Sequence, residues 1–515
     1  MRTKLFVGRV MGQPLFTLLW GTVLLAIPVL AADLNSTDQL LQHGQAAYQR
    51  GSFPQAVLDW TEAAQLYEQQ GQLREQAQAL THLSQALQQV GRYREAAAAL
   101  QLALGIEEEQ GGDSARRALI LGRLGNLGTV LGKDHEAETL LNEALGIARS
   151  VNDPQLTASL LNDLGNLLAG TGRRTQAINV YMESAGLAAR TGQDLLKVSS
   201  TINAARASAQ KGAYREAQAL LDPVPGWLAG LEESHDKAFA WLTYGITHET
   251  LRGASNRGVL SQFEARDRSI EAGSRKIVVR PSEPSVSEEA AAPTEQGAAM
   301  PAKEEVVRAS AQAYWAAHKT ALAIEDPAAE SYAWGYLGHL YEQEGRVEEA
   351  LDLTRRAVSA AQKIRAPQSL YRWHWQTARL LNVLGKAEEA MAAYRRAIET
   401  LQPIRQEFLV GSRNRATSFR ETTGPLFFEL SDLLLRRATA TTDKQAHQAL
   451  LVQAQDTVEL FKAAELQDYF KDECVATARS RSTAVAESTK NTAVIYPIVL
   501  PDRLELLVSL PDGLR

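Results

Sequence analysis

Small and apolar residues recur along the chain with a period of about 40 residues. A glycine followed five residues later by an alanine occurs seven times, and the first five of these glycines are 40 or 41 residues apart. The seven pairs are Gly51/Ala56, Gly91/Ala96, Gly132/Ala137, Gly172/Ala177, Gly212/Ala217, Gly345/Ala350 and Gly385/Ala390. A fixed period of this length indicates a repeat protein, in which each unit buries its apolar face only against its neighbours.

The spacing around each pair predicts two antiparallel helices that are joined at the glycine. A small residue lies seven positions before each glycine, and a mostly small residue lies seven positions after each alanine. Small side chains at these places let two helices approach closely, and glycine can adopt the left-handed conformation that ends the first helix. Larger side chains then fill the space beside the contact, at equivalent positions of the second helix: Trp60, Leu100, Tyr181 and Tyr394.

The repeating unit resembles the tetratricopeptide repeat (TPR) family. The family's signature is closely matched by residues 331–341 (SYAWGYLGHLY), followed by Gly345, Val347, Glu349 and Ala350. The resemblance implies a mainly α fold, a right-handed superhelix of helix pairs (an α-solenoid) whose concave groove binds a protein or peptide. Because the family's usual period is shorter, the 40-residue period implies either longer helices or longer loops.

The TPR resemblance also implies which residues face the groove. In that family, the residue after the small position of the first helix points into the concave surface. Here these residues are Gln45, Gln85, Asn126, Asn166, Arg206, His339 and Arg379, and Asn162 lies one turn before Asn166. Such amide and cationic side chains can hydrogen-bond an extended peptide backbone or bind a carboxylate. The alternative is that they are ordinary exposed polar residues, and both interpretations stay open at this point.

The sixth unit is interrupted. Trp241, Tyr244 and Gly245 indicate a first helix, but the helical pattern resumes only at Val306. We predict that residues 252–305, which are poor in aromatic side chains, form a disordered insertion. The alternative is a binding or processing segment for a charged partner, since its first half is basic and its second half acidic. The repeats would then occupy residues 37–251 and 306–401.

After Leu401 the repeat register is lost. Two long helical patterns follow, over residues 416–438 and 446–472, and residues 492–500 and 503–510 then have the apolar, β-rich pattern of a hairpin. A lone hairpin is marginal in water and needs further strands or a helix to cover it.

This carboxyl-terminal region, residues 406–515, resembles the CHAT family, caspase-like domains that follow TPR arrays. The resemblance is carried by residues 427–435, 464–470, Cys474 and 492–513. It implies helices and a β-hairpin that begin an α/β caspase-like domain, truncated before the strands that hold the catalytic His and Cys.

The family's catalytic pair has no counterpart in this sequence. The last histidine, His447, and the only cysteine, Cys474, both precede the first expected strand, whereas the family's pair follows it. The charges of Asp472 and Glu473 disfavour a Cys474 thiolate, so a structural thiol is expected there rather than a nucleophile. We therefore expect a TPR scaffold without catalytic activity. The alternative is the regulatory front half of a split CHAT-type cysteine peptidase, with a separately encoded caspase-like half as partner.

Composition excludes several other classes of protein. The 515 residues carry 54 Lys and Arg against 60 Asp and Glu, a net charge of −6, so no basic field favours nucleic acid. One cysteine excludes a disulfide scaffold and a four-thiolate zinc site. The nine histidines show neither HxxxH nor HExxH spacing, and no phosphate-binding glycine loop occurs. We expect neither a metal nor a cofactor.

The amino end has the pattern of a targeting segment. Arg2, Lys4 and Arg9 precede an apolar stretch over residues 15–30, and the small residues Ala31 and Ala32 suit cleavage by signal peptidase. We predict a cleaved signal peptide over residues 1–32 and a periplasmic or secreted mature protein with no membrane contact. The alternative is an uncleaved amino-terminal membrane anchor.

Overall fold

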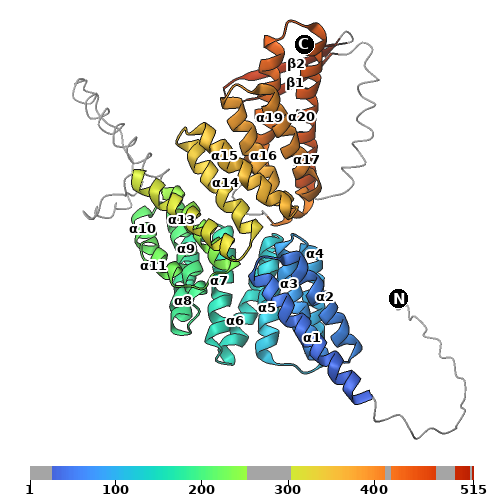
Figure 1. The fold of residues 1–515 in the computed structure, drawn as a ribbon, viewed down its shortest axis with the longest axis vertical. Coiled ribbons are helices and arrows are strands. Elements are labelled where there is room, and N and C mark those ends of the chain that lie inside the picture. The colour runs from blue at the N-terminus through green and yellow to red at the C-terminus, as the bar shows by residue number, and fades with distance from the viewer. Residues whose placement is uncertain (1–25, 252–302, 412–418, 471–492, 501, 511–512) are drawn as a thin grey trace, which may run out of the picture.

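The computed structural model describes residues 26–251, 303–411, 419–470, 493–500, 502–510 and 513–515 (Figure 1). Most of the predicted signal peptide, the predicted insertion and the segment with Cys474 lie outside the described residues, so those predictions stay predictions. No helix in the described ranges combines the length and the apolar character that a membrane span requires.

The repeating unit is a pair of antiparallel helices. The first four pairs are α1 (Ala26–Gln49) with α2 (Phe53–Gln69), α3 (Leu73–Gln89) with α4 (Tyr93–Glu109), α5 (Ser114–Val130) with α6 (Asp134–Ser150), and α7 (Pro154–Gly170) with α8 (Arg174–Arg190). Each helix from α2 to α8 has 17 residues and is followed by a turn of three residues, or of four residues after α4. The long period therefore arises from longer helices and not from longer loops.

Four further pairs continue the array. They are α9 (Asp194–Lys211) with α10 (Tyr214–Leu221) and α11 (Val224–Ala229), a helix over residues 235–251 with α13 (Lys303–Ala323), α14 (Pro327–Gln343) with α15 (Val347–Lys363), and α16 (Pro367–Val383) with α17 (Ala387–Gly411). The second helix of the fifth pair is broken near Pro223, where the ring removes a backbone donor. Helix α13 includes residues 303–305, which the sequence pattern had assigned to the end of the insertion.

Left-handed glycines end the first helices, as predicted. All seven glycines of the repeat pattern have φ between 70° and 90°. Only glycine adopts this conformation without a steric cost, so the glycine stops each helix and lets the chain reverse within three residues.

The small residues of the first helices meet large rings of the second helices, which confirms the packing that the spacing predicts. A Cβ atom on Gly44 would lie 2.5 Å from Trp60 Nε1, and one on Gly165 would lie 2.5 Å from Tyr181 Cε1. Both rings are almost fully buried, at 1% and 0% exposure. Each glycine therefore provides the space that its partner ring fills.

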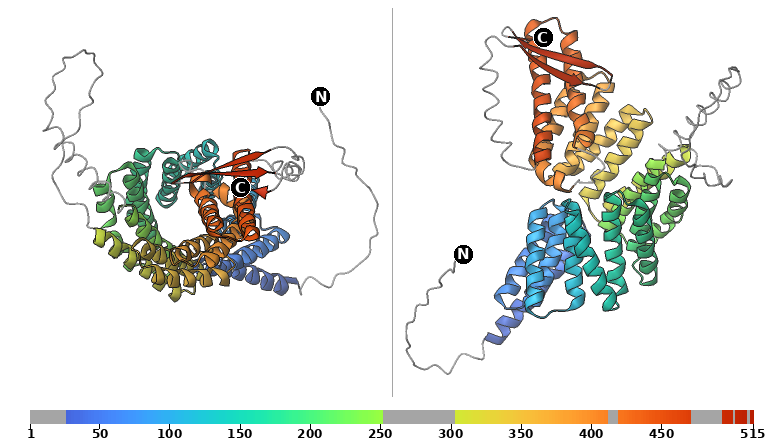
Figure 2. Two further views of the ribbon diagram at one scale, coloured as in Figure 1. Left: turned by 90° about the horizontal axis from the view of Figure 1, so that it is seen from above. Right: turned by 180° about the vertical axis from the view of Figure 1, so that it is seen from behind.

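The array curves until its first pair meets the sixth and seventh pairs (Figure 2). Phe53, at the start of α2, packs edge-on against His235 with ring centroids 4.7 Å apart. His235 Nδ1 lies 2.5 Å from Asp326 Oδ2, and this carboxylate lies directly beside Gly51. Asp326 is 1% exposed and caps α14 through the backbone nitrogens of Ala328 and Ala329. The contact closes one turn of the superhelix.

Helices and a small sheet follow the last repeat. They are α18 (Phe419–Thr422), α19 (Gly424–Ala440), α20 (Lys444–Phe470) and the antiparallel strands β1 (Val494–Val499), β2 (Leu504–Leu510) and β3 (Gly513–Leu514), in the order β1-β2-β3. One continuous apolar core joins α16 and α17 to α19, α20 and the strands, through residues such as Tyr394, Leu434 and Ile498. The prediction of a mainly α solenoid followed by helices and antiparallel strands is confirmed.

Candidate binding surface on the inner helices

The first helices of successive pairs form the inner layer of the array. Helix α5 packs against α7, α7 against α9, and α14 against α16, whereas second helices such as α6 and α8 approach each other less closely. In a curved stack, the layer with the closest neighbours lies on the concave side. The predicted groove residues all belong to these first helices.

Polar side chains connect α3, α5 and α7 along this layer. The Gln85 side-chain oxygen, turned toward Arg123, accepts hydrogen bonds from both terminal guanidinium nitrogens at 2.6 and 2.7 Å. One helix further along, Asn126 Nδ2 donates to Asp163 Oδ1 at 2.6 Å. Two predicted residues, Gln85 and Asn126, are thus hydrogen-bonded to charged neighbours, Arg123 and Asp163, that the repeat pattern did not predict.

The polar contacts continue from α7 to α9. Asn203 Nδ2 donates to Asn162 Oδ1 at 3.1 Å, and Arg206 Nη2 donates to Asn203 Oδ1 at 2.9 Å. Asn166 Oδ1 accepts from the buried Tyr181 hydroxyl at 2.8 Å. The structure therefore brings Asn162, Asn166 and Arg206 together around Asn203.

These contacts define a concave polar tract, which consists of Gln85, Arg123, Asn126, Asn162, Asp163, Asn166, Asn203 and Arg206. All eight side chains are half-buried. Within the described chain, Asn126 uses only its nitrogen and Asn166 only its oxygen for hydrogen bonds to other side chains. The Asn126 oxygen and the Asn166 nitrogen remain, so the tract offers both an acceptor and a donor to an extended peptide backbone.

Burial raises the pKa of Asp163 to about 6, although Arg123 and the hydrogen bond from Asn126 oppose this shift. The folded carboxyl therefore holds its proton more tightly than an unfolded aspartate, whose pKa is about 3.9. Its contribution to stability is fully present at low pH and is lost as the pH rises through about 6.

Replacing Asp163 by asparagine is expected to remove this pH dependence. The free energy of unfolding of Asp163→Asn, measured relative to that of the native protein, should rise by about 1 kcal/mol from pH 5 to pH 8. The reason is that the native carboxylate becomes a buried charge at the higher pH, whereas the amide stays neutral. Chemical denaturation of both proteins at the two pH values measures the difference. If the free energy of unfolding changes equally with pH in the two proteins, Asp163 does not titrate in this range.

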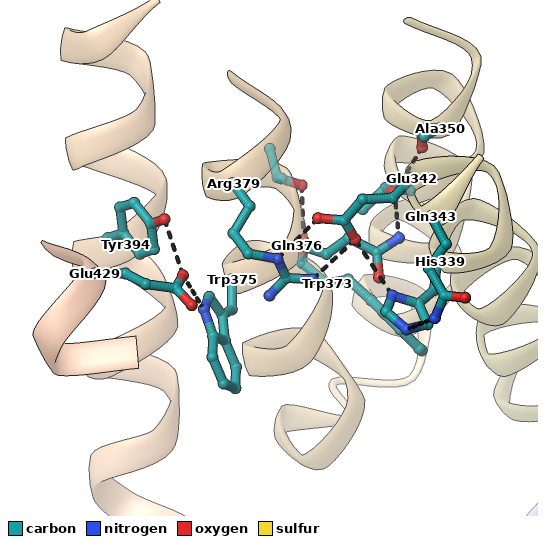
Figure 3. Close-up of polar contacts among 12 residues, drawn as sticks. His339, Glu342, Gln343, Ala350, Trp373, Trp375, Gln376, Arg379, Tyr394 and Glu429 are labelled. Atoms are coloured by element: carbon teal, nitrogen blue, oxygen red, sulfur yellow. Dashed lines mark hydrogen bonds and ion pairs between the residues drawn. The ribbon is translucent and has the colours of Figure 1, made fainter. Parts of the chain in front are cut away.

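A second polar group lies on α14 and α16 (Figure 3). Arg379 Nε and Nη2 donate to the two carboxylate oxygens of Glu342 at 2.8 and 2.9 Å, and His339 Nδ1 lies 3.3 Å from Glu342 Oε2. Burial opposes the charge on Glu342, but the hydrogen bonds from His339 and Arg379 prevail and lower its pKa to about 2. The predicted residues His339 and Arg379 are therefore held by one carboxylate.

The last repeat is tied to α19 beside this group. Trp375 Nε1 donates to Glu429 Oε2 at 2.7 Å, and the Tyr394 hydroxyl donates to the same oxygen at 3.0 Å (Figure 3). The Arg379 guanidinium lies over the Trp375 ring, 5.2 Å from its centroid. Helix α19 therefore lies directly beside this second polar group. Arg379 is held by the Glu342 carboxylate and by the Trp375 ring.

Gln45 stands apart from the other predicted residues. It lies exposed on α1 and makes no side-chain hydrogen bond within the described chain. The predicted residues therefore fall into one connected tract on α3 to α9, one pair on α14 and α16, and the isolated Gln45.

A second row of residues on the same helix faces was not predicted from the sequence. Arg123, Asp163 and Asn203 each lie three positions before a predicted groove residue, and Gln376 holds the same place before Arg379. Residues three apart are neighbours on one face of a helix. Reading one turn back from each predicted position would have found them.

Of the two residues weighed for thiol catalysis, only His447 lies in the described chain. His447 lies on α20, where its Nδ1 donates to the Ala438 carbonyl at 2.9 Å as part of the contact with α19. Cys474 lies outside the described residues. Among those residues, no group of three or more His, Cys, Asp or Glu side chains is arranged to hold a metal ion.

Comparison with known proteins places tetratricopeptide repeats in this array. Family models of the tetratricopeptide repeat match residues 77–110 and 116–189, and no curated protein shows significant similarity to the chain. Solved structures with similar helix arrays include BtubC (BKLC) from P. vanneervenii, which is 16% identical with a TM-score of 0.32, over 47% of this chain and 99% of that one. They also include a Rap protein complexed with Competence and Sporulation Factor, which is 12% identical with a TM-score of 0.41, over 79% of this chain and 99% of that one. The family models show that the solenoid of helix pairs contains tetratricopeptide repeats, over residues 77–110 and 116–189.

Proposed function

We propose that this protein is an extracytoplasmic scaffold that binds an extended segment of another protein along the concave polar tract, without catalysing a reaction itself. The observation that carries this proposal is the connected row of half-buried amides and arginines across four successive inner helices. A tetratricopeptide array suits a protein-interaction scaffold, because its stacked helices present one long surface.

The chemistry of the tract favours a peptide backbone over a particular side chain. Amide groups both donate and accept, so the Asn126 oxygen and the Asn166 nitrogen can pair with the alternating N–H and C=O groups of an extended strand. Arg206 adds a cation that can hold a carbonyl or a carboxylate of the same ligand. The array holds these groups on rigid helices, which lowers the entropic cost of binding.

Truncating the tract is expected to weaken peptide binding about 100-fold. The variant Asn126→Ala/Asn166→Ala/Arg206→Ala removes three hydrogen-bonding side chains, each worth about 1 kcal/mol in a bound complex. Linear peptides selected from a displayed library on the native protein, and titrated by calorimetry, provide the measurement.

A matched variant separates the tract from general effects of truncation. Gln101, Asn142 and Arg190 are exposed on the outer helices α4, α6 and α8, so Gln101→Ala/Asn142→Ala/Arg190→Ala should bind the same peptides with native affinity. Equal losses in both variants, or native affinity in the tract variant, would contradict the proposal.

The extracytoplasmic location rests on the charged and apolar pattern of the amino end. We expect the mature protein, purified from its own cells, to begin after Ala31 or Ala32 and to fractionate with the periplasm or the medium. An intact amino terminus in the membrane fraction would instead favour the anchor.

A second candidate function follows from the sheet. Its outer face exposes Ile495, Val499, Leu504 and Leu506 by 53–62%, and Val499 pairs with Leu504 across the strands. Contiguous exposed apolar residues indicate a surface that another polypeptide covers. We propose that, if this chain is the regulatory half of a split CHAT-type peptidase, the separately encoded caspase-like half packs on this face.

The two proteins are then expected to co-purify as a complex when they are expressed together. Leu504→Glu/Leu506→Glu should abolish the complex, because it places two charges in an apolar interface. Leu58→Glu, at a 63% exposed position of α2, should leave it intact. Separate elution of the two native proteins would reject this candidate.

A further inference from the structure

A surface cavity lies between α15, α16 and α17. It has a volume of about 320 Å³ and is lined by Arg355, Val358, His374, Thr377, Leu381, Glu389, Ala392 and Arg396. Two of these helices are second helices of their pairs, and α16 provides the floor through His374, Thr377 and Leu381. None of the concave polar tract residues lines the cavity, so it is a separate feature of the molecule.

The charge of this cavity is not balanced. Arg355, on α15, and Arg396, on α17, face it together with a single carboxylate, Glu389. Neither arginine side chain makes an ion pair or a hydrogen bond in the part of the chain that the structure describes. By contrast, the neighbouring Arg356 pairs with Asp352 at 2.8 Å, and Arg379 pairs with Glu342. Arg355 and Arg396 are exposed at the cavity, so both guanidinium groups are free to bind an anion.

The histidine on the floor experiences this excess of positive charge. Burial, together with the charge of Arg396, lowers the pKa of His374 to about 4. Its ring is therefore neutral at pH 7 and carries one N–H that can donate. Arg355 and Glu389 are the other charged groups that line the cavity, so an anion placed here would offset two cations and find a donor in the ring.

We propose that this cavity binds an anionic group of the size of a carboxylate or phosphate. Arg355 and Arg396 hold its charge from opposite walls, and a ring nitrogen of His374 donates a hydrogen bond from the floor. Val358, Leu381 and Ala392 supply the apolar part of the lining. The same chemistry suits an acidic segment of a bound protein or a free small anion, and the experiment distinguishes the two.

The test uses the full chain with ¹³C-labelled histidine and two probes, inorganic phosphate and a tetraglutamate peptide. Binding is expected to shift the His374 resonance and to raise its pKa by about one unit, because the anion offsets the charge of Arg396. Arg355→Gln and Arg396→Gln should each weaken binding about tenfold. Arg356→Gln, a neighbour whose charge is already paired, should leave binding unchanged.

A gain of affinity provides the stricter check. Glu389→Gln removes the one carboxylate of the cavity and should tighten binding severalfold, a result that a damaged fold would not produce. Binding of phosphate as tight as that of the peptide would identify a free small anion, and binding of the peptide alone would identify an acidic segment of a partner. The proposal is overturned if neither probe shifts His374, or if the arginine variants and Glu389→Gln bind as the native protein does.

Discussion

Replacing Gly165 by alanine is expected to destabilise the fourth helix pair by about 2 kcal/mol. The added Cβ would lie 2.5 and 2.6 Å from two carbons of the Tyr181 ring. This ring cannot move away easily, because it is fully buried and its hydroxyl donates a hydrogen bond to Asn166 Oδ1. Native-state hydrogen exchange measures the loss as faster opening of α7 and α8.

A second glycine on the same helix pair serves as the control. Gly186, on α8, is exposed, and a Cβ added there would meet no atom within 4 Å. Gly186→Ala should therefore stabilise the pair by about 0.5–1 kcal/mol, the usual gain when alanine replaces glycine in a helix. Similar exchange rates in the two variants would contradict the close helix approach on which the repeat depends.

Replacing Gly51 by alanine is expected to cost about 3 kcal/mol and to open the closed turn of the array. Gly51 has a φ of +75°, which strains any other residue by about 1–2 kcal/mol. In addition, the new Cβ would lie 2.6 Å from Asp326 Oδ2, in the buried contact with His235. The clash adds a cost that arises only if the first pair meets the seventh.

Gly172→Ala isolates the conformational part of this cost. Gly172 has a φ of +80°, and a Cβ added there would meet no atom within 4 Å. Its replacement by alanine should therefore cost only about 1 kcal/mol. Thermal denaturation compares the two variants, and small-angle scattering should show a larger radius of gyration for Gly51→Ala alone. An equal cost and an unchanged radius for both would show that the turn of the superhelix is open in solution.

The local part of the fold could be predicted from sequence because its determinants lie within one repeat. The contact of Gly165 with Tyr181 joins residues 16 positions apart, and the left-handed turn at Gly172 needs only one glycine. Both recur with the period, so the pattern identifies them several times over.

The closure of the array could not be predicted in the same way. Phe53 and His235 meet only because small rotations between successive helix pairs add up over five repeats. The sequence of one repeat does not determine the total rotation over five repeats. Neither Phe53 nor His235 belongs to the periodic pattern. The Asp326 carboxylate illustrates the same limit, since its position before Pro327 predicts a helix cap but not a contact with Gly51.

The helices that carry the candidate surface were predictable from the sequence, but the contacts between its residues were not. The position after each small residue of the pattern lies on the first helix of its pair, and Asn126 and Asn166 are examples on α5 and α7. The partners of these residues depend on the distance between neighbouring repeats. That distance brings Asp163 to Asn126, and Asn203 to Asn162, across more than 35 positions of sequence.

A photo-crosslinking amino acid at position 85, incorporated into the protein in its own cells, tests whether the concave polar tract binds another protein. Gln85 lies at the edge of the concave polar tract, whereas Met182, 42% exposed on the outer helix α8, provides a matched position away from it. We expect a discrete crosslinked protein from position 85 and none from position 182. Crosslinks of equal yield from both positions, or from position 182 alone, would contradict it.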